Sequence, residues 1–579
     1  MKILLVAINA KYIHSNLAVY SLKAYAEKYG VRKDYIPEVV EYTINQQVGQ
    51  ILADIYKRKA DLICFSCYIW NISLVEQITQ ALSKVSKASL WLGGPEVTYH
   101  SRRILEKYPH IKGIIRGEGE KTFLQIITAT VQGEVTLAKG LGKLDENYIQ
   151  IPGISWRTEA GGIVENEAVC PLTLDEIPFP YTTLAPFQNR IIYYESSRGC
   201  PFSCSYCLSS VEQGLRFRNL ELVVKELQWF LEQGVSQVKF VDRTFNCNSK
   251  RAREIWTYLK ENDNGKTNFH FEISADLLTE ADLELLSTIR PGLIQFEIGV
   301  QSTNDATLVE IGRQMDQEKL KKSVEQLHKG RNIHQHLDLI AGLPYEDLVS
   351  FKNSFDEVYR LQPNQLQLGF LKVLKGSLIE DKARQYELQY QEVPPYEVLS
   401  SKWLSYESIL LLKGVEEMVE VYYNSRQFEE TTTYLAEKFS RPFDMYEALY
   451  HYYEEKGFWG ENHTRVTRYE VLFAFGESIL VTAEERELFR QKLILDFYGR
   501  ENVKKRPHFA GSETVSKEEA SSFYAQEEQE RRYLAGYESY DKRQLRKMTH
   551  LERIDGKLLL FDYRDRDPWS GQAKVHVII

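Results

Sequence analysis

The stretch Ser197-Arg-Gly-Cys200-Pro-Phe-Ser-Cys204-Ser-Tyr-Cys207 places three cysteines at spacings of four and three residues. It directly follows an apolar run, IIYYESS, which is typical of a buried strand. With seven cysteines in 579 residues, independent placement would give this pattern about 0.001 times per chain, so chance is a poor explanation. Three thiolates on one tight loop can surround a metal ion or one corner of a metal cluster.

The cysteine pattern favours an iron–sulfur cluster over a structural zinc site. A closed zinc site needs a fourth Cys or His ligand, and the next cysteine downstream, Cys247, is 40 residues away on another predicted loop. A [4Fe–4S] cube held by three thiolates leaves one iron open to bind another molecule, as an open catalytic metal site does. We therefore expect Cys200, Cys204 and Cys207 to hold such a cluster and to be the catalytic metal ligands.

The segment around and after the cysteines alternates between strand-like and helix-like patterns. Strand-like apolar runs begin at Ile191, Val235, Phe269, Leu293, His336 and Leu366. Helical patterns lie between them, over 219–233, 249–262, 279–289, 316–330 and 347–360. Strands that alternate with helices predict a parallel α/β fold, here a partial (β/α)6 barrel over residues 190–393, with its chemistry at the carboxyl ends of the strands.

A three-cysteine loop of this spacing, after the first strand of a partial barrel, resembles the radical S-adenosylmethionine (SAM) superfamily. The resemblance implies that the open iron of a [4Fe–4S] cluster binds SAM. It also implies that one electron from the cluster cleaves SAM to a 5′-deoxyadenosyl radical.

The same resemblance implies positions for SAM contacts. Tyr206, before the third cysteine, matches a residue that packs near the adenine, and Asp242 lies where the family binds the SAM amino group, although the usual Gly-Gly-Glu is absent here. Ribose and methionine contacts are implied for Glu272, Ser274, Glu297 and Gln301. The alternative is that some of these side chains are polar residues of the barrel interior that bond to their neighbours.

The first 140 residues show a second α/β rhythm. Short apolar runs begin at Lys2, Val39, Asp61, Ser89 and Lys112 and alternate with amphipathic stretches of helix length. Such runs are typical of parallel strands buried on both faces, so we expect a doubly wound, Rossmann-like domain over residues 1–140. Ligands of these sheets bind beyond the carboxyl ends of the strands.

A doubly wound domain in front of such a barrel, with the loops GGPEVT and GEGE, resembles the cobalamin (B12)-binding domain of one large radical SAM subfamily. The chain as a whole resembles that subfamily through KYIHSNLA, LGGPEVT, DEIPFPY, KFVDRTFN and FEIGVQS. Glycines in its loops allow close backbone approach, and exposed amides can meet the polar groups of a corrinoid. The expected cobalamin contacts are Tyr12, Ser15, Asn16, Ser66, Tyr68, Gly93, Gly94, Pro95, Glu96, Gly117, Glu118 and Glu120. Because no Asp-x-His-x-x-Gly motif occurs, we expect no protein histidine on cobalt.

Two further segments complete the domain organisation. Residues 141–189 are rich in Gly, Pro and Thr and predict a linker. Residues 394–579 carry Tyr, Glu and Leu at helical spacing and end in two strand-like runs, KLLLFDY and KVHVII. They predict a mainly helical C-terminal domain, for which no motif indicates a role. The fold class is therefore α/β with a helical C-terminal addition.

Composition limits the classes of function. With 43% hydrophobic and 26% charged residues, the chain is typical of a globular protein. A net charge of −9 disfavours binding to nucleic acid through overall charge, so a small molecule, peptide or protein is favoured over RNA as the substrate. Without a signal peptide or an apolar run of the roughly 18–20 residues that a membrane span needs, we expect a cytoplasmic enzyme with no membrane partner.

The subfamily resemblance implies an enzyme that couples a SAM-derived radical to cobalamin, reduced by a donor such as flavodoxin or ferredoxin. Methylation of an unactivated carbon is the leading expectation, and cobalamin-dependent cyclisation or rearrangement is an alternative. A tRNA methylthiotransferase-like enzyme is disfavoured, because its second cluster needs N-terminal cysteines and only Cys64 and Cys67 occur there. A non-catalytic sensor of a cluster or cobalamin is also open, and it differs from the enzymes in not consuming SAM.

Overall fold

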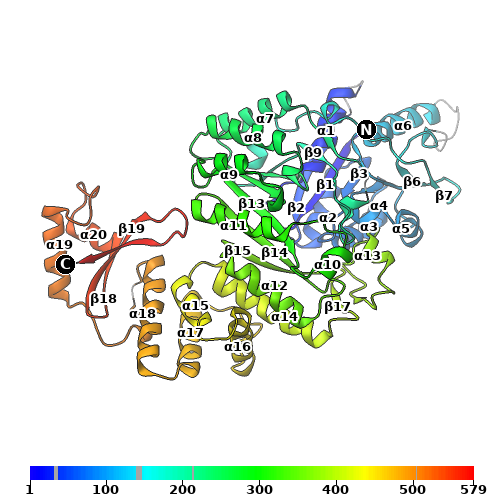
Figure 1. Ribbon diagram of the computed structural model, residues 1–579. Helices are drawn as coiled ribbons and strands as arrows, with labels where there is room; N and C mark the ends of the chain where they lie inside the picture. Colours follow the sequence, from blue (N-terminus) through cyan, green and yellow to red (C-terminus); the bar gives the residue numbers. More distant parts are fainter. Residues whose placement is uncertain (31–34, 36, 139–146, 212–213, 504, 579) are drawn as a thin grey trace.

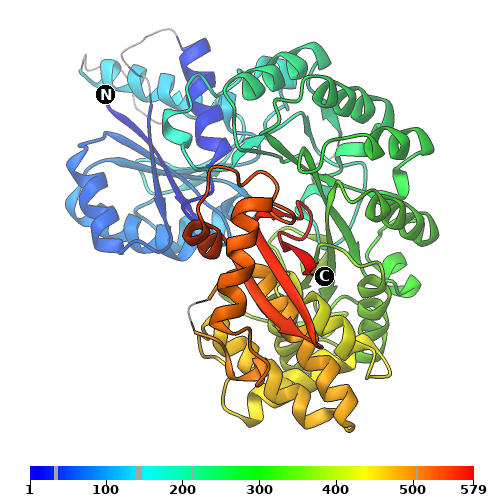
Figure 2. The same cartoon turned by 90° about the vertical axis from the view of Figure 1, so that its left-hand side faces the viewer.

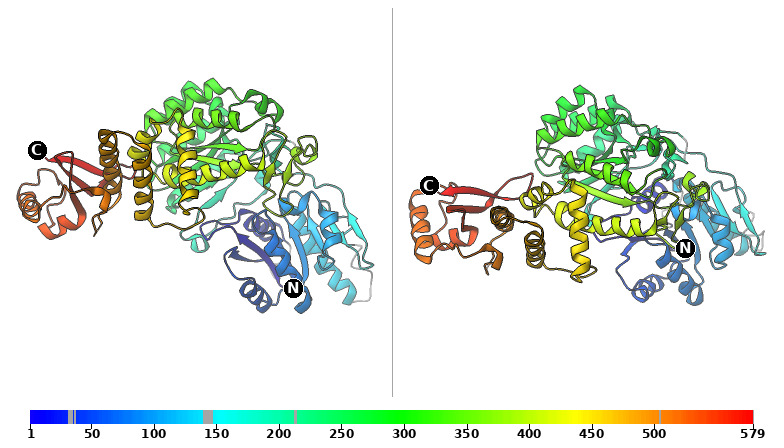
Figure 3. Two further views of the ribbon diagram at one scale, coloured as in Figure 1. Left: turned by 90° about the horizontal axis from the view of Figure 1, so that it is seen from below. Right: turned by 60° about the horizontal axis from the view of Figure 1, so that its bottom comes forward.

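The computed structural model describes residues 1–30, 35, 37–138, 147–211, 214–503 and 505–578 (Figure 1). A mainly parallel sheet and a fully parallel sheet lie next to each other, and a smaller antiparallel sheet stands apart at the far end of an elongated molecule (Figures 1 and 3). Within the described residues, no helix combines the length and the apolar character that crossing a bilayer requires.

The N-terminal domain is the doubly wound sheet that the sequence predicts. Its described strands follow the order β2-β1-β3-β4-β5-β6-β7, and the first five of these are parallel. Strands β1 and β3 are buried along their whole lengths, in agreement with their continuous apolar runs. The strands are β1 (Ile3–Asn9), β2 (Glu38–Thr43), β3 (Leu62–Ser66), β4 (Ser89–Gly93), β5 (Gly113–Ile115), β6 (Ile154–Arg157) and β7 (Ile163–Glu165). The helices are α1 (Leu17–Tyr29), α2 (Val48–Lys57), α3 (Ile72–Val85), α4 (Pro95–Thr98), α5 (Ser101–Lys107) and α6 (Glu120–Ala138).

The segment expected to be a linker adds two strands to this sheet. Strand β6 pairs antiparallel with β5, and β7 pairs antiparallel with β6. They were missed because three- and four-residue strands joined by a glycine turn have too few positions to show a period. Part of the expected linker, residues 141–146, lies outside the described residues.

The central domain is the predicted partial barrel. In the described chain its parallel strands follow the order β15-β14-β13-β12-β11-β8, so β8 and β15 form two open edges. Helices cover the outer face of the sheet (Figure 2). The strands are β8 (Ile192–Tyr194), β11 (Gln237–Phe240), β12 (Asn268–Ile273), β13 (Ile294–Gln301), β14 (His334–Ala341) and β15 (Gln365–Phe370). The helices are α7 (Leu220–Glu232), α8 (Ser249–Glu261), α9 (Glu280–Ser287), α10 (Asp305–Glu310), α11 (Gln317–Gly330) and α12 (Leu348–Arg360).

Strand β13 shows how the barrel sheet separates an apolar face from a polar face. Its residues alternate between buried and half-buried along the whole strand. The buried residues Phe296 and Ile298 belong to the main hydrophobic core, whereas the half-buried residues include Gln295 and Glu297. Because successive side chains of a strand point to opposite faces, the inner face of the barrel is polar and open to solvent.

The C-terminal part is mainly helical, as expected, and ends in a small sheet of strand order β18-β19-β20 in the described chain. Its helices are α13 (Leu378–Asp381), α14 (Tyr406–Val419), α15 (Glu429–Ala436), α16 (Pro442–Glu455), α17 (Arg465–Ile479), α18 (Ala483–Arg500), α19 (Lys517–Glu530) and α20 (Lys542–Met548). Strands β16 (Gln389–Tyr390) and β17 (Val398–Ser400) form a short pair, and the final sheet contains β18 (Thr549–Ile554), β19 (Lys557–Arg566) and β20 (Ala573–Ile578). The two predicted strands are β19 and β20, and β18 was not predicted.

Candidate functional site

The three cysteines lie on the loop that joins β9 (Ser197–Arg198) to β10 (Arg216–Phe217). These two short strands pair antiparallel and close the loop at its base. The loop follows β8 and therefore lies at the carboxyl end of a barrel strand, as predicted. Gly199 has φ of +94°, and a Cβ there would lie 2.1 Å from the carbonyl oxygen of Gly214. Glycine is thus required where the two sides of the loop approach each other.

Backbone contacts hold the cysteine loop against the barrel. The N–H of Ser205 donates to the carbonyl oxygen of Ile311 at 2.8 Å, and the N–H of Ile379 donates to that of Ser205 at 2.9 Å. Cys204 is buried, whereas Cys200 and Cys207 are partly exposed. The three cysteines thus differ in how far they are exposed.

Arg313 provides positive charge beside this loop. Its guanidinium donates to the carbonyl oxygen of Gly299 and interacts with Cys204 and Tyr206. Burial raises the pKa of the Cys204 thiol, and Arg313 opposes that effect. On the other side, Cys200 Sγ lies 3.6 Å from Thr244 Oγ1. Because metals bind the thiolate form, a buried cation next to Cys204 favours metal binding by this loop.

The side chains of the described residues do not form a compact site for a single metal ion. Within the described residues, no three His, Cys, Asp or Glu side chains surround one point where a metal ion would sit. A [4Fe–4S] cube instead binds each thiolate to a different iron. Cys200, Cys204 and Cys207 stay the predicted ligands of such a cube, because all three lie on the one loop between β9 and β10.

Asp242 is buried at the carboxyl end of β11, with 1% of its surface exposed. Its carboxylate accepts hydrogen bonds from Ser196 N–H at 2.8 Å, Ser196 Oγ at 2.6 Å and Ser197 Oγ at 2.8 Å. Burial raises its pKa to about 6, and these hydrogen bonds act in the opposite direction. The carboxylate that we expected at the SAM amino group thus joins β11 to the entrance of the cysteine loop.

The predicted contacts Glu272 and Glu297 lie together on the inner face of the barrel. Lys239 Nζ is 2.8 Å from Glu297 Oε2 and 3.9 Å from Glu272 Oε1. His270 Nε2 is 3.1 Å from Glu297 Oε2. Burial and the neighbouring Glu297 raise the pKa of Glu272 to about 7. Although burial acts to raise it, the contacts with His270 and Lys239 hold the pKa of Glu297 well below its usual range.

Gln301 and Ser274 end the neighbouring strands. Ser274 Oγ donates to Asp276 Oδ1 at 2.6 Å. Gln301 has φ of +72° and follows a register shift in β13. Among the described residues, three buried polar atoms in this region have no hydrogen-bond partner, namely Gln301 Oε1, Arg313 Nε and Ser205 Oγ. Unsatisfied buried polar atoms are costly, so these residues fit a polar ligand such as SAM, which carries amino, carboxylate and hydroxyl groups.

The loops after β1 and β3 meet at the point where the strand order of the N-terminal sheet reverses. Asn16 Nδ2 donates to Ser66 Oγ at 3.3 Å, and Trp70 Nε1 donates to the carbonyl oxygen of Ile8 at 3.2 Å. Tyr68 stacks on Trp70 with ring centroids 4.4 Å apart. Ligands of open α/β sheets bind at such a reversal. The predicted contacts Tyr12, Ser15, Asn16 and Tyr68 are in these two loops, and Ser66 ends β3.

This edge of the N-terminal sheet exposes aromatic surface. Tyr12 is 63% exposed and Trp70 is 44% exposed. Large aromatic residues grouped at a sheet edge mark a binding surface. At the same edge of the sheet, after β5, Glu120 Oε2 is buried and has no hydrogen-bond partner among the described residues. An exposed aromatic surface and an open acceptor at one sheet edge suit a corrinoid, whose flat ring carries amide donors.

The conformation of the glycine-rich loop after β4 is determined by its contact with the residue after β3. Gly94 has φ of +115°, and a Cβ there would lie 2.4 Å from the carbonyl oxygen of Cys67. Gly93 ends β4, and Pro95 occupies the first turn of α4. The glycine at position 94 is therefore required by the close approach of β4 and the residue after β3.

The predicted acidic contacts Glu96, Glu118 and Glu120 form ion pairs across the domain boundary. Glu96 is paired with Lys375 and accepts a hydrogen bond from Tyr396. Arg198 lies 3.1 Å from Glu118 and 2.9 Å from Glu120, and Arg216 also pairs with Glu118, next to Gly117. Sequence reasoning did not find these pairs, because their partners are at least 78 residues apart.

Other contacts across this boundary were also missed. Arg190 Nη1 lies 2.6 Å from Glu41 Oε2, and His14 Nδ1 lies 2.7 Å from the hydroxyl of Tyr193. Ser15 Oγ donates to the carbonyl oxygen of Ile191 at 2.9 Å. Together they hold the carboxyl edge of the N-terminal sheet against the start of the barrel.

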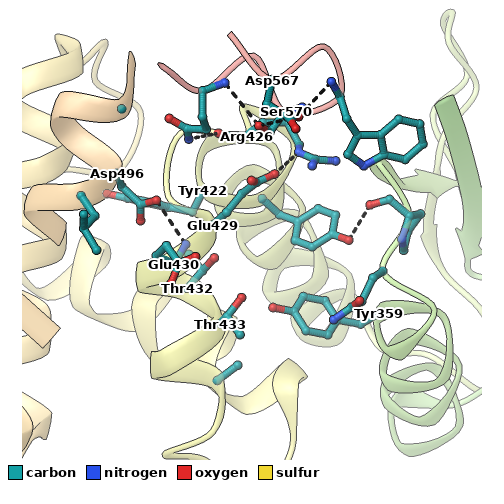
Figure 4. Close-up of a pocket in the computed structure, with 18 of the residues that line it drawn as sticks. Tyr359, Tyr422, Arg426, Glu429, Glu430, Thr432, Thr433, Asp496, Asp567 and Ser570 are labelled. Atoms are coloured by element: carbon teal, nitrogen blue, oxygen red, sulfur yellow. Dashed lines mark hydrogen bonds and ion pairs between the residues drawn. The ribbon is translucent and has the colours of Figure 1, made fainter. Parts of the chain in front are cut away.

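A cavity of about 820 Å³ lies elsewhere in the molecule (Figure 4). Its walls come from the ends of α11 and α12, from α15 and from the β19–β20 loop, and they include Tyr359, Arg426, Glu429, Asp496 and Asp567. Helices α11 and α12 lead into the amino ends of β14 and β15. The cavity is therefore at the end of the barrel opposite to the cysteine loop.

Family models match three consecutive parts of the chain. Residues 3–127 match the B12 binding domain, residues 194–358 match the radical SAM superfamily, and residues 384–568 match a family described as a protein of unknown function, DUF4080. The chain thus combines a B12-binding domain with a radical SAM domain. The radical SAM domain implies a [4Fe–4S] cluster and SAM, and the B12-binding domain implies cobalamin, which are the cofactors expected from the sequence.

Curated relatives share part of this organisation. The radical SAM protein is 35% identical over 181 residues to "Uncharacterized methyltransferase PH0819" of Pyrococcus horikoshii, covering 29% of this chain and 36% of the relative. It is 24% identical over 361 residues to "Cobalamin-dependent radical SAM methyltransferase TokK" of Streptomyces tokunonensis, covering 57% of this chain and 50% of the relative. The chain thus spans half or less of the length of these two relatives.

A solved structure shows the same fold. The cobalamin-dependent S-adenosylmethionine radical enzyme OxsB, solved with aqua-cobalamin and S-adenosylmethionine, aligns with a TM-score of 0.56 at 15% identity. The alignment covers 86% of this chain and 84% of OxsB. The order of a doubly wound domain, a partial barrel and a helical addition is therefore confirmed.

Proposed function

We propose that this radical SAM protein is a cobalamin-dependent methyltransferase that acts on an unactivated carbon. One observation carries the proposal. Arg198, two residues before Cys200, contacts Glu118 and Glu120 of the B12-binding domain directly. The cysteine loop and the carboxyl edge of the N-terminal sheet thus face the same boundary, where a radical and a methyl donor can reach one substrate. The relatives named as methyltransferases support this assignment.

The cofactors would supply the reactive groups, and the side chains of this protein would bind and orient them. When bound, the cluster supplies the electron that cleaves SAM to a 5′-deoxyadenosyl radical, and cobalamin supplies the methyl group. Cys200, Cys204 and Cys207 hold the cluster, and Arg313 stabilises negative charge beside it. Tyr206, Ser274 and Gln301 are the proposed SAM contacts. The remaining proposed contacts are Asp242 and, on the polar inner face of the barrel, Glu272 and Glu297.

The B12-binding domain covers the carboxyl end of the barrel through buried ion pairs and so limits access of water to a radical. Its proposed cobalamin contacts are the residues of the β1 and β3 loops and the glycine loops expected from the sequence. A reductant such as flavodoxin or ferredoxin is required, and a cytoplasmic location is part of this proposal. A small molecule, peptide or protein is the proposed substrate class.

The cysteines of the N-terminal domain argue against a methylthiotransferase-like enzyme. Cys64 lies within β3 and Cys67 directly after it, and both are buried. Burial raises the pKa of both thiols. Buried neutral thiols in a sheet core are poor ligands for the second cluster that such an enzyme would need.

The experiment that tests the proposal is anaerobic. We would reconstitute the protein with iron, sulfide and hydroxocobalamin, measure bound iron and the visible spectrum, add SAM with a strong reductant, and quantify 5′-deoxyadenosine and S-adenosylhomocysteine by mass spectrometry. Four irons, bound corrinoid and both products support the methyltransferase. Deoxyadenosine alone favours cyclisation or rearrangement, and a loaded protein that leaves SAM intact favours the sensor.

A matched pair of variants controls for the cluster. Cys204→Ala removes a proposed ligand, whereas Cys170→Ala removes an exposed cysteine outside the loop. We expect Cys204→Ala to lose iron and deoxyadenosine together and Cys170→Ala to keep both. Equal iron content in the two variants would remove the cluster assignment.

A further inference from the structure

Arg198 belongs to the cysteine loop by sequence and to the domain boundary by its contacts. Its guanidinium lies 2.7 Å from Glu195 of the barrel, 3.1 Å from Glu118 and 2.9 Å from Glu120. Only 16% of its side chain is exposed, and the side chains of Glu118 and Glu120 are more deeply buried. One side chain therefore joins the start of the cysteine loop to the loop after β5.

The loop after β5 is a cofactor-facing element of the N-terminal domain. It occupies the carboxyl edge of the sheet, where the ligands of such sheets bind, and it ends where α6 begins at Glu120. One oxygen of Glu120 accepts from Arg198 and the other is buried without a partner among the described residues. Glu120 is thus paired on the cluster side and unsatisfied on its other oxygen.

The charges of this group favour joint movement of the two loops. Three carboxylates, from Glu118, Glu120 and Glu195, share two cations, Arg198 and Arg216. Separating buried partners leaves uncompensated charges in a poorly solvated place, which is strongly unfavourable. A shift of the β5 loop must therefore carry Arg198 with it, and Arg198 is covalently close to Cys200.

From these contacts we infer that Arg198 is a positioning residue that couples the two cofactor sites. Binding of cobalamin beside the β5 loop strengthens binding of SAM at the cluster, and SAM strengthens binding of cobalamin by the same factor, as linkage requires. The inference rests on the proposed function, because it needs both cofactors to bind. It assigns to Glu118 and Glu120 a role in transmitting the effect between the loops.

The test measures binding and does not depend on turnover. SAM affinity of the cluster-loaded protein is measured by anaerobic equilibrium dialysis with and without hydroxocobalamin. Hydroxocobalamin affinity is measured by its absorbance change with and without SAM. We expect each ligand to tighten the other by at least about fivefold, the lower end of typical coupling between sites. Linkage requires the two measured factors to be equal, so their comparison checks the measurement.

Variants assign the coupling to Arg198. We expect Arg198→Met to reduce the coupling factor to about one, and Arg198→Lys to retain part of it, because lysine keeps the charge but not the several fixed donors of arginine. Glu120→Gln leaves the cysteine loop unchanged and should also weaken the coupling. This second site keeps the test valid if Arg198→Met folds poorly.

Arg190→Met is the matched control. Arg190 pairs with Glu41 across the same boundary, and the two side chains are 13% and 7% exposed. It is outside the cysteine loop, and neither partner lies in the β5 loop. Its removal can lower either affinity, but the coupling factor should remain at the wild-type value.

The outcomes separate this inference from the proposed function. A wild-type protein that binds both cofactors with no mutual effect overturns the coupling and leaves the methyltransferase standing. The inference also fails if Arg198→Met and Glu120→Gln keep the wild-type factor, or if Arg190→Met loses it equally. A protein that binds neither a cluster nor cobalamin overturns both.

Discussion

The carboxylate of Asp242 accepts hydrogen bonds from both the backbone N–H and the hydroxyl of Ser196, at 2.8 Å and 2.6 Å. Asp242 follows the carboxyl end of β11, and Ser196 follows the carboxyl end of the adjacent strand β8. Ser196 leads directly into the cysteine loop. The buried carboxylate of Asp242 thus holds the backbone where the loop leaves the barrel. This contact makes the position of the loop dependent on the protonation of a residue outside it.

Asp242 predicts a specific dependence of stability on pH. Its pKa is about 6 in the folded protein, above the ordinary aspartate value of about 3.9. Between these two values the folded state binds more protons than the unfolded state, so stability falls as pH rises through this window. The ionised group costs about 3 kcal/mol above pH 6. The urea midpoint of the wild type, measured from pH 4 to 7, should therefore fall relative to that of Asp242→Asn. Parallel curves would contradict the assignment.

The glycines of the cysteine loop offer a matched pair. Gly199 and Gly214 both have positive φ, but a Cβ at Gly199 would meet the carbonyl of Gly214, whereas no described atom lies within 4 Å of a Cβ at Gly214. Each alanine substitution lowers the free energy of unfolding by about 1–2 kcal/mol, because a residue with a Cβ is strained at positive φ. Only Gly199→Ala also displaces the base of the loop, so iron content after reconstitution should fall in Gly199→Ala and persist in Gly214→Ala. Similar iron contents would show that the close approach does not shape the cluster site.

The inner face of the barrel predicts a rescue. Lys239→Met leaves Glu297 with His270 as its remaining ion-pair partner described here, and we expect destabilisation by about 2 kcal/mol. Adding Glu297→Gln removes the carboxylate that has lost its lysine partner, and it should recover part of the lost stability. Thermal midpoints of the wild type, the two single variants and the double variant measure the coupling. Additive effects would mean that the pair contributes no interaction energy.

Trp70 predicts the location of the corrinoid. It is 44% exposed at the reversal of strand order, whereas Trp459, in the C-terminal part, is 37% exposed. Replacing an exposed aromatic anchor by alanine typically weakens binding about tenfold. We expect this loss for Trp70→Ala in hydroxocobalamin titrations, with no change for Trp459→Ala. An equal effect of both variants would place the corrinoid elsewhere.

Local patterns in the sequence were sufficient for most of the architecture. The cysteine spacing and the apolar runs predicted the loop, the six barrel strands and the doubly wound sheet, because each signal lies within a few neighbouring residues. Strand β18 was missed although Asp555 and Gly556 both have positive φ, the arrangement of a tight Asp-Gly hairpin turn. That dipeptide, followed by the predicted strand KLLLFDY, was a usable signal.

The contacts between domains were beyond reach of a single sequence. Nothing local marks Glu120 as a partner of Arg198, or Glu96 as a partner of Lys375, because their meeting depends on how two completed domains dock. The same limit applies to Asp242, whose neighbours Ser196 and Ser197 are on another strand. The sequence places these acids after the carboxyl ends of strands, and only the structure shows what they contact there.

The hydrophobic core sets where the chain can be divided. One continuous apolar cluster joins barrel residues such as Leu337 and Leu366 to Leu412 of α14 and Phe497 of α18, whereas Tyr524, Leu545 and Leu551 near the C-terminus form a cluster of their own. The boundary expected at 393/394 therefore cuts through a shared interior. The barrel and helices α14–α18 therefore share one interior. Strand β19 ties the last segment to it, because Leu559 and Phe561 lie in the main cluster whereas Leu560 lies in the C-terminal one. A truncation anywhere after residue 393 would expose apolar surface on the part that remains.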